Sequence, residues 1–167
     1  AKTGPMSFLE LREQPFGKAA SVDDNVPLLN VLFSKDLALY RPLLDRQRRD
    51  SVSVVRDLAY GSDARHRLDV YRPEAPSRQS LPVLVFLHGG GFIRGDKRDR
   101  ENVGQRFARE DFVTMVPNYR LGPAHRWPAG AEDVAAVIDW VRTHAGEYGG
   151  NPQRIVLAGE SAGAAHV

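Results

Sequence analysis

Three short runs of apolar residues limit the folds open to this chain more than any other feature. They lie at residues 83–87, 112–116 and 155–158, and the first reads Val-Leu-Val-Phe-Leu without a polar residue. A continuous apolar run of this length is typical of a strand that is buried on both faces, as in a parallel sheet. Helical patterns separate the runs, and this alternation of strand and helix indicates an α/β fold with right-handed crossovers.

Apolar residues at helical spacing fill the gaps between these runs. Residues 130–144 hold the clearer pattern, an i, i+3, i+4, i+7 series formed by Val134, Val137, Ile138 and Val141. Around residues 99–110, Val103 and Phe107 lie one turn apart. The sequence therefore predicts a helix in each gap.

Residues 1–50 differ from the part of the chain that holds these patterns. Asp24 to Pro27 forms a helix-start signal, and apolar residues follow it at helical spacing. Two shorter β patterns, at residues 52–55 and 68–71, then open the remainder of the chain. We therefore expect a helical N-terminal segment followed by an α/β unit over residues 51–167.

Composition favours one globular domain and excludes several kinds of site. Of 167 residues, 42% are apolar and 26% charged, which is ordinary for a globular domain. The chain has no cysteine, which excludes a disulfide scaffold, a thiolate zinc site and a cysteine nucleophile. No apolar run approaches the length of a membrane span, and the first 20 residues lack the apolar core of a signal peptide. We expect a cytoplasmic protein with no membrane span, no metal and no cofactor.

One basic stretch could suggest a nucleic-acid partner. It contains Arg94, Lys97, Arg98 and Arg100, but acidic residues interleave with them and the net charge of the chain is only +2. A nucleic-acid-binding surface needs a larger excess of positive charge. We therefore interpret the stretch as a solvated loop and helix start.

The third apolar run leads directly into Gly159-Glu160-Ser161-Ala162-Gly163, a G-x-S-x-G sequence. Between a strand and a helix, this sequence is typical of a nucleophile elbow, a sharp turn that exposes a reactive serine. The turn strains the serine backbone, and side chains two positions before and after the serine would crowd it. We predict that Ser161 is the nucleophile and that the N–H of Ala162 faces the oxygen of the attacked carbonyl.

The first apolar run leads into a second motif, His88-Gly89-Gly90-Gly91-Phe92. A glycine-rich loop at a strand end can cradle a phosphate, but no phosphate-binding motif is completed here. An oxyanion hole is the better interpretation, because glycines let backbone N–H groups approach a substrate oxygen. His88 is interpreted as a prop for this loop rather than as a metal ligand or general base. Phe92 is interpreted as a packing residue or as one wall of an acyl pocket.

With both motifs in place, the chain resembles α/β-hydrolases of the carboxylesterase and hormone-sensitive-lipase-like group. Residues 119–133 are similar to the bacterial esterase pattern YRLAPEHPFPAALED at nine of fifteen positions. Residues 148–155 are similar to the FGGDPxRI run before the elbow strand, and residues 68–73 to the second strand of the family. The order and spacing of all five motifs agree from about residue 52 to the end of the sequence.

This resemblance implies roles for particular residues. Ser161 is the residue that becomes acylated. The oxyanion hole is formed by the N–H groups of Gly90, Gly91 and Ala162. Glu160 either acts electrostatically near a catalytic histidine or orders the elbow, and we favour the second role.

The resemblance also implies an α/β-hydrolase fold with a mostly parallel sheet and flanking helices, of which this chain is the N-terminal part. Residues 1–50 would contribute a cap, and residues 51–167 would hold strands in the order 1-2-4-3-5, with the elbow strand at a bare edge. Only six residues follow Ser161, whereas in the family the triad acid and then the histidine come after the serine. His166 lies about 500° of helical rotation beyond the serine, so we expect it to point away and to pack against the sheet. The triad acid and histidine are therefore expected from a missing C-terminal portion, on this or a separate chain.

The leading hypothesis is a serine ester hydrolase that cleaves small to medium acyl esters through an acyl-enzyme on Ser161. Two alternatives stay open: an arylformamidase-like amidase with the same machinery, and a non-catalytic homologue that binds a ligand in the pocket. The expected partners are a small-molecule ester, the C-terminal remainder of the enzyme and a second copy of the chain in a homo-oligomer.

Overall fold

The structure is a computed structural model that describes Pro42 and residues 50–167. The helices and cap expected within residues 1–50 fall almost entirely on residues 1–41 and 43–49, which lie outside the described residues. In the described part, the strands form one sheet in the order β1-β2-β4-β3-β5, as the family resemblance implied. Their bounds are β1 (Val52–Ala59), β2 (Arg67–Pro73), β3 (Leu81–Leu87), β4 (Val113–Pro117) and β5 (Gly150–Gly159).

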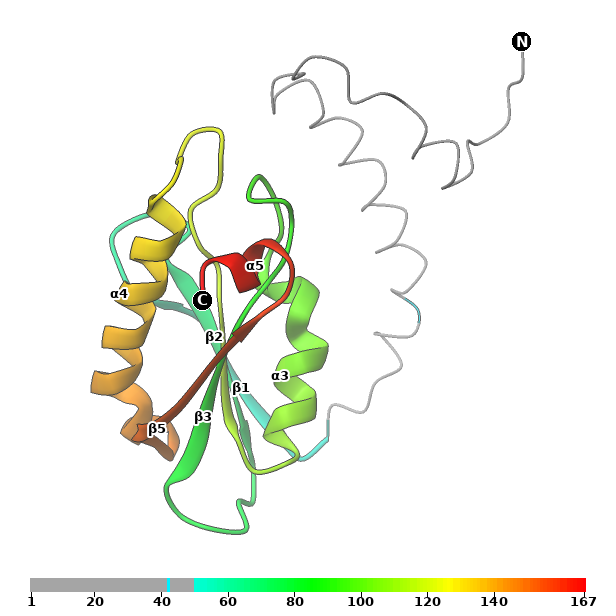
Figure 1. The fold of residues 1–167 in the computed structure, drawn as a ribbon. Coiled ribbons are helices and arrows are strands. Elements are labelled where there is room, and N and C mark those ends of the chain that lie inside the picture. Colours follow the sequence, from blue (N-terminus) through cyan, green and yellow to red (C-terminus); the bar gives the residue numbers. More distant parts are fainter. Residues whose placement is uncertain (1–41, 43–49) are drawn as a thin grey trace. The chain divides into compact units, whose positions relative to one another are not determined.

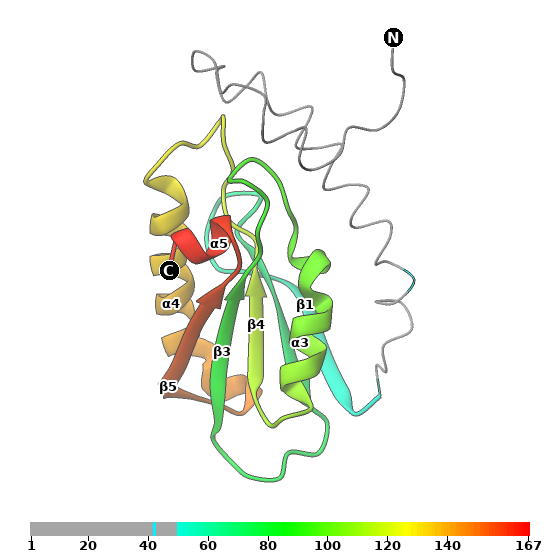
Figure 2. The same cartoon turned by 45° about the vertical axis from the view of Figure 1, so that its right-hand side comes forward.

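The strand directions make the sheet mostly parallel, as predicted. β3 pairs in parallel with both β4 and β5, whereas β2 is antiparallel to its two neighbours β1 and β4. Among the strands of the described residues, only β2 therefore runs against the others. The carboxyl ends of β3, β4 and β5 point to the same end of the sheet (Figure 2).

Two helices cover opposite faces of the sheet. α3 (Glu101–Ala108) connects β3 to β4, and α4 (Ala129–His144) connects β4 to β5. These two crossovers run in opposite directions along the sheet, so the same right-handed crossover places the helices on different faces (Figure 1). A short 3-10 helix, η1 (Lys97–Arg100), precedes α3, and a second, η2 (Ala145–Tyr148), follows α4.

Each face of the sheet has its own apolar cluster. The larger cluster lies on the α4 side and includes Val70, Val85, Met115, Val137 and Val141. The smaller cluster lies on the α3 side and consists of Val52, Tyr71, Ala108 and Val116, with Val54 against it. Val134, Val137 and Val141 are buried as the helical spacing predicted, and Ile138 packs against them.

Two apolar residues of the predicted elements are not in the core. Phe107, paired with Val103 in the predicted helix, is 38% exposed, and the buried side of α3 is formed by Gly104, Gln105 and Ala108. The reason is Tyr71, which packs so closely that a Cβ on Gly104 would lie 2.4 Å from its ring. The third apolar run is not buried on both faces, because β5 lies at the bare edge that the family resemblance implied. In the described sheet β5 has only β3 as a neighbour, and Val156 is 50% exposed.

No helix among the described residues is long and apolar enough to cross a membrane.

Candidate active site

The two predicted motifs meet at the carboxyl end of the sheet. Leu87, the last residue of β3, pairs with Gly159, the last residue of β5. The N–H of Glu160 donates to the carbonyl of Leu87 over 3.2 Å, so the two turns that follow are joined at their base. α5 (Ala162–Ala165) begins directly after the serine and lies at this end of the sheet (Figure 2).

Ser161 has the strained backbone that the elbow requires. Its φ is +48° and its ψ −118°, and its side chain is exposed. A Cβ on Gly159 would lie 2.6 Å from the carbonyl carbon of Gly163, and a Cβ on Gly163 would lie 2.5 Å from the oxygen of Leu87. Contacts this short with backbone atoms cannot be relieved by a rotamer change, so the steric prediction for both glycines is confirmed.

The glycine loop after β3 folds back on itself. The carbonyl of Gly90 accepts hydrogen bonds from the N–H groups of Ile93, over 3.3 Å, and Arg94, over 3.2 Å. Gly90 and Gly91 both have positive φ, +138° and +61°. No described residue accepts a hydrogen bond from the N–H of Gly91 or Ala162, which leaves both groups available to a ligand oxygen.

His88 is buried beneath this loop and has the contacts of a prop. Its ring is 1% exposed, stacks on Tyr119 at 4.4 Å between centroids, and donates from Nδ1 to the carbonyl of Gly89 over 2.7 Å. The Tyr119 hydroxyl donates to the His88 carbonyl over 2.8 Å. Burial lowers the pKa of His88 and raises the pKa of Tyr119 to about 12, so both groups are neutral near pH 7.

Glu160 connects the elbow to the glycine loop. Its Oε1 accepts a hydrogen bond from the N–H of Gly89 over 3.3 Å and also forms an ion pair with Arg100 at the start of α3. These contacts fit the ordering role that we favoured. The sequence offered no signal for Arg100, because it lies in a charged stretch 60 residues from its partner.

Phe92 stands at the outer end of the loop. It has a positive φ of +67°, is 46% exposed, and contacts the ring of His166 edge-on at 5.3 Å between centroids. His166 also contacts Tyr119 edge-on at 4.9 Å, so it packs against loop aromatics beyond the strand ends rather than against the sheet. Burial lowers the pKa of His166.

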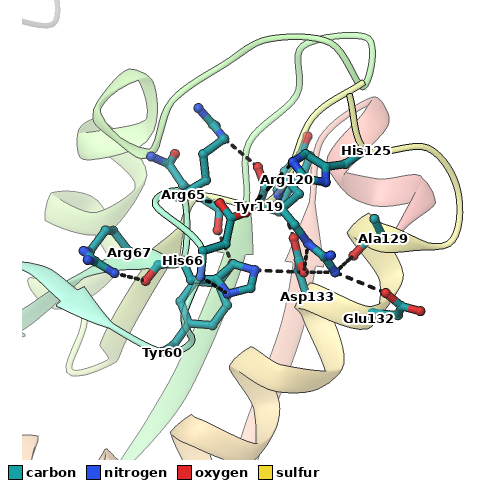
Figure 3. A network of polar contacts seen from close by, with 12 residues as sticks. Tyr60, Arg65, His66, Arg67, Tyr119, Arg120, His125, Ala129, Glu132 and Asp133 are labelled. Carbon is teal, nitrogen blue, oxygen red and sulfur yellow. Dashed lines mark hydrogen bonds and ion pairs between the residues drawn. The ribbon is translucent and has the colours of Figure 1, made fainter. Parts of the chain in front are cut away.

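The motif at residues 119–133 is held closed by one buried carboxylate. Asp133, 1% exposed, accepts from the Arg120 backbone N–H over 2.6 Å, from Arg120 Nε over 2.7 Å and from His66 Nε2 over 3.0 Å (Figure 3). Because His66 Nδ1 accepts from the N–H of Asp63 over 3.2 Å, its proton lies on Nε2. Both nitrogens of His66 are therefore occupied.

This motif also supports the glycine loop. The N–H of Gly122 donates to the carbonyl of Phe92 over 2.8 Å. The guanidinium of Arg65 donates to the carbonyls of Tyr119, over 2.7 Å, and Gly95, over 2.9 Å. The loops after β3 and β4 are thus tied to each other and to the turn between β1 and β2.

Lys97 contradicts the prediction of a solvated basic stretch. Its side chain is 2% exposed, and its Nζ lies 2.6 Å from Asp69 Oδ1 and 2.7 Å from Asp57 Oδ1. Asp69 itself is fully buried in β2. Two carboxylates compensate the buried ammonium, and the hydrogen bond from Lys97 holds the pKa of Asp57 below its usual range. The sequence did hold one signal for this buried pair, since Asp69 is a charged residue inside the apolar pattern of β2.

Among the described residues, no group of three or more His, Asp or Glu side chains could hold a metal ion.

Comparisons with known proteins identify a family and several relatives. The model of the BD-FAE family matches residues 68–167. Esterase LipC of Mycobacterium tuberculosis is 36% identical over 109 residues, which cover 65% of this chain and 27% of LipC. Carboxylesterase NlhH of the same organism is 41% identical over 87 residues, which cover 52% of this chain and 27% of NlhH. The chain thus spans about a quarter of the length of these relatives.

Comparison of this structure with solved structures identifies proteins that share its fold. Esterase B from Lactobacillus rhamnosis superposes with a TM-score of 0.76 at 22% identity, over 86% of this chain and 48% of that one. The likeness confirms the predicted α/β-hydrolase fold.

Proposed function

The chain belongs to the BD-FAE family, and we propose on that basis that it carries the nucleophile of a carboxylesterase-type serine hydrolase. The observation that carries the proposal is the geometry of Ser161: an exposed serine with a φ of +48°, at the carboxyl end of β5 and beside a glycine loop. Esterase names among the relatives support ester bonds as the substrate.

In the proposed reaction, Ser161 Oγ attacks the carbonyl carbon of a small to medium acyl ester while a base takes its proton. The negative charge that develops on the carbonyl oxygen is stabilised by the N–H groups of Gly90, Gly91 and Ala162. The tetrahedral intermediate collapses, the alcohol leaves with the proton, and Ser161 is acylated. Water then attacks the acyl-enzyme, the acid is released, and the serine regains its proton.

The base is proposed to come from outside the described residues. His88 is buried and its Nδ1 is bound to Gly89, and both nitrogens of His66 are occupied. His144 caps α4 through the carbonyl of Trp140 over 2.9 Å, and His166 packs between Phe92 and Tyr119. The remaining histidine, His125, lies beside Asp63, with 3.9 Å between its Nε2 and Oδ2 of Asp63. We propose that a C-terminal portion, which the longer relatives have room for, supplies the histidine and its acid. Mass spectrometry of the complete protein and of any polypeptide that co-purifies with it tests this.

The test of the proposed function is turnover by the complete protein. p-Nitrophenyl acetate, p-nitrophenyl octanoate and N-formylkynurenine separate short esters, longer esters and an arylformamidase substrate. We expect hydrolysis of at least one p-nitrophenyl ester, and its loss in Ser161→Ala. Preferred turnover of N-formylkynurenine would favour an arylformamidase-like amidase over an esterase. Unchanged ester turnover in Ser161→Ala would overturn the proposal.

A further inference from the structure

The ion pair between Glu160 and Arg100 has no part in the reaction above, yet it lies between the elbow and the glycine loop. We propose that Arg100 is a positioning residue, which holds the Glu160 carboxylate on the N–H of Gly89 and offsets its charge beside the oxyanion hole. This inference rests on the proposed function and adds Arg100 to it.

The contacts of Glu160 show how the pair fixes the loop. Its Oε1 accepts from the N–H of Gly89, the residue directly before the proposed donors Gly90 and Gly91. A Cβ on Gly89 would lie 2.9 Å from this same oxygen. The carboxylate therefore approaches the loop backbone as closely as it does because residue 89 is glycine. Because Glu160 directly precedes Ser161, one side chain sets the distance between the nucleophile and the donors.

Arg100 stands on a well-anchored support. It ends η1, and its NH1 group donates to the carbonyl of Asp99 over 2.6 Å. Asp96 caps η1 by accepting from the N–H of Arg98 over 2.9 Å, and Asn118 donates to Asp96 over 2.9 Å. The Arg100 side chain is only 22% exposed. A guanidinium held in this way restricts the carboxylate that it binds.

The charge of Glu160 gives the pair a second effect. An unpaired carboxylate next to the oxyanion hole would repel the negative charge that develops in the transition state. The guanidinium of Arg100 offsets this charge. Loss of Arg100 alone should therefore harm catalysis more than simultaneous loss of both charges, whereas a purely structural role predicts that the double variant is the worse of the two.

The experiment compares Arg100→Met, Arg100→Lys, Glu160→Gln and the double variant Arg100→Met with Glu160→Gln in the complete protein. Gln at position 160 keeps an oxygen for the N–H of Gly89. Arg106→Met is the matched control, because Arg106 lies on α3 and forms an exposed i, i+4 pair with Glu110, just beyond the end of the helix. The readouts are kcat and KM for a p-nitrophenyl ester, and the Ki of a trifluoromethyl ketone, whose adduct places an oxyanion in the hole.

We expect Arg100→Met to lower kcat by about 10- to 100-fold with little change in KM, since small misplacements of catalytic groups have effects of this size. The Ki of the ketone should rise by a similar factor. Arg100→Lys should keep most of the activity, the double variant should be faster than Arg100→Met, and Arg106→Met should match the unchanged protein.

A double variant no faster than Arg100→Met, or an Arg100→Met variant equal to Arg106→Met, would overturn the proposal. A change in the KM of Arg100→Met without a fall in its kcat would overturn the proposal as well. Ser161→Ala in the same series separates this inference from the proposed function. If Ser161→Ala is inactive while Arg100→Met is unaffected, only the role of Arg100 fails; if Ser161→Ala is fully active, the proposed function fails with it.

Discussion

The backbone of Ser161, with a φ of +48°, is strained by about 1–3 kcal/mol. Such strain persists only where surrounding contacts impose it. Here the contacts lie on both sides of the serine. The carbonyl of Glu160 accepts from the N–H groups of Gly163, over 2.8 Å, and Ala164, over 3.3 Å. The N–H of Glu160 is bound to Leu87 at the end of β3. The backbone around Ser161 is thus fixed by contacts within the protein itself.

The two proposed donor glycines should respond differently to substitution. A Cβ on Gly90 would lie 2.0 Å from the Arg94 carbonyl oxygen, whereas a Cβ on Gly91 meets no atom within 4 Å. We expect Gly90→Ala to lower the free energy of unfolding by more than about 3 kcal/mol, from overpacking and backbone strain together. Gly91→Ala should cost about 1–2 kcal/mol, from its positive φ alone. Urea unfolding of both variants measures this, and equal losses would contradict the loop geometry.

His88 should make stability depend on pH. Burial lowers its pKa in the folded protein, while the unfolded chain has the ordinary value of about 6.5. Below about pH 6.5 the unfolded chain therefore binds a proton that the folded protein does not, so the free energy of unfolding falls as the pH drops toward the folded pKa. Below the folded pKa both states are protonated and this contribution no longer changes.

Urea unfolding at pH 7.5 and 5.5 tests this effect. We expect the fall in unfolding free energy to be smaller in His88→Gln than in the unchanged protein. The pKa of His166 is also lowered by burial, so His166→Gln should remove a further part of the fall. An identical fall in the unchanged protein and in His88→Gln would mean that His88 is not buried as a neutral ring.

At the scale of elements, Asp133 in the first turns of α4 holds the loop after β4 in place. Its carboxylate binds Arg120 at the start of that loop and His66 from the turn before β2 (Figure 3). The same loop donates to the carbonyl of Phe92 through Gly122. One buried carboxylate thus connects the family motif at residues 119–133 to the glycine loop, which gives a structural reason for the Asp that ends the motif.

Asp133→Ala should therefore be strongly destabilising. It leaves the N–H groups of Arg120 and the N–H of His66 without their buried acceptor, and breaking a buried pair costs about 3–5 kcal/mol. Glu132→Ala is the matched control, because Glu132 is 61% exposed and binds Arg120 over 3.1 Å; its loss should cost less than about 1 kcal/mol. Thermal unfolding of the two variants measures the difference, and similar midpoints would contradict a supporting role for Asp133.

The elements themselves were largely predictable, whereas their charged contacts were not. The apolar runs located β3, β4 and β5, and the helical periodicity located α4, because such patterns record which residues face the core. They could not show that Lys97 is buried, since burial there depends on Asp57 of β1 and Asp69 of β2. They also could not show the start of β5 at Gly150, five residues before the apolar run, because its first residues, Gly-Asn-Pro-Gln-Arg, carry no apolar pattern.

For the whole molecule, the order of the strands came from the family resemblance, because periodicity does not indicate which strands are neighbours. The position of both motifs at one end of the sheet follows from that order together with the parallel directions of β3 and β5. The contacts that assemble the site join residues far apart in the chain: His66 and Asp133 are 67 positions apart, and Arg100 and Glu160 are 60. Pairings over such distances depend on the folded backbone and leave no mark in a single sequence.

The central claim is that Ser161 is an activated nucleophile, and a fluorophosphonate probe tests it most directly. The complete protein is treated with the probe and measured by intact mass and peptide mapping, alongside Ser161→Ala and Ser62→Ala, which removes an exposed serine in the turn between β1 and β2. We predict one adduct, on the peptide that holds Ser161, present in Ser62→Ala and absent in Ser161→Ala. No adduct on the unchanged protein would contradict the claim and favour a homologue that only binds its ligand. An adduct that persists in Ser161→Ala would contradict it by placing the reactive group on another residue.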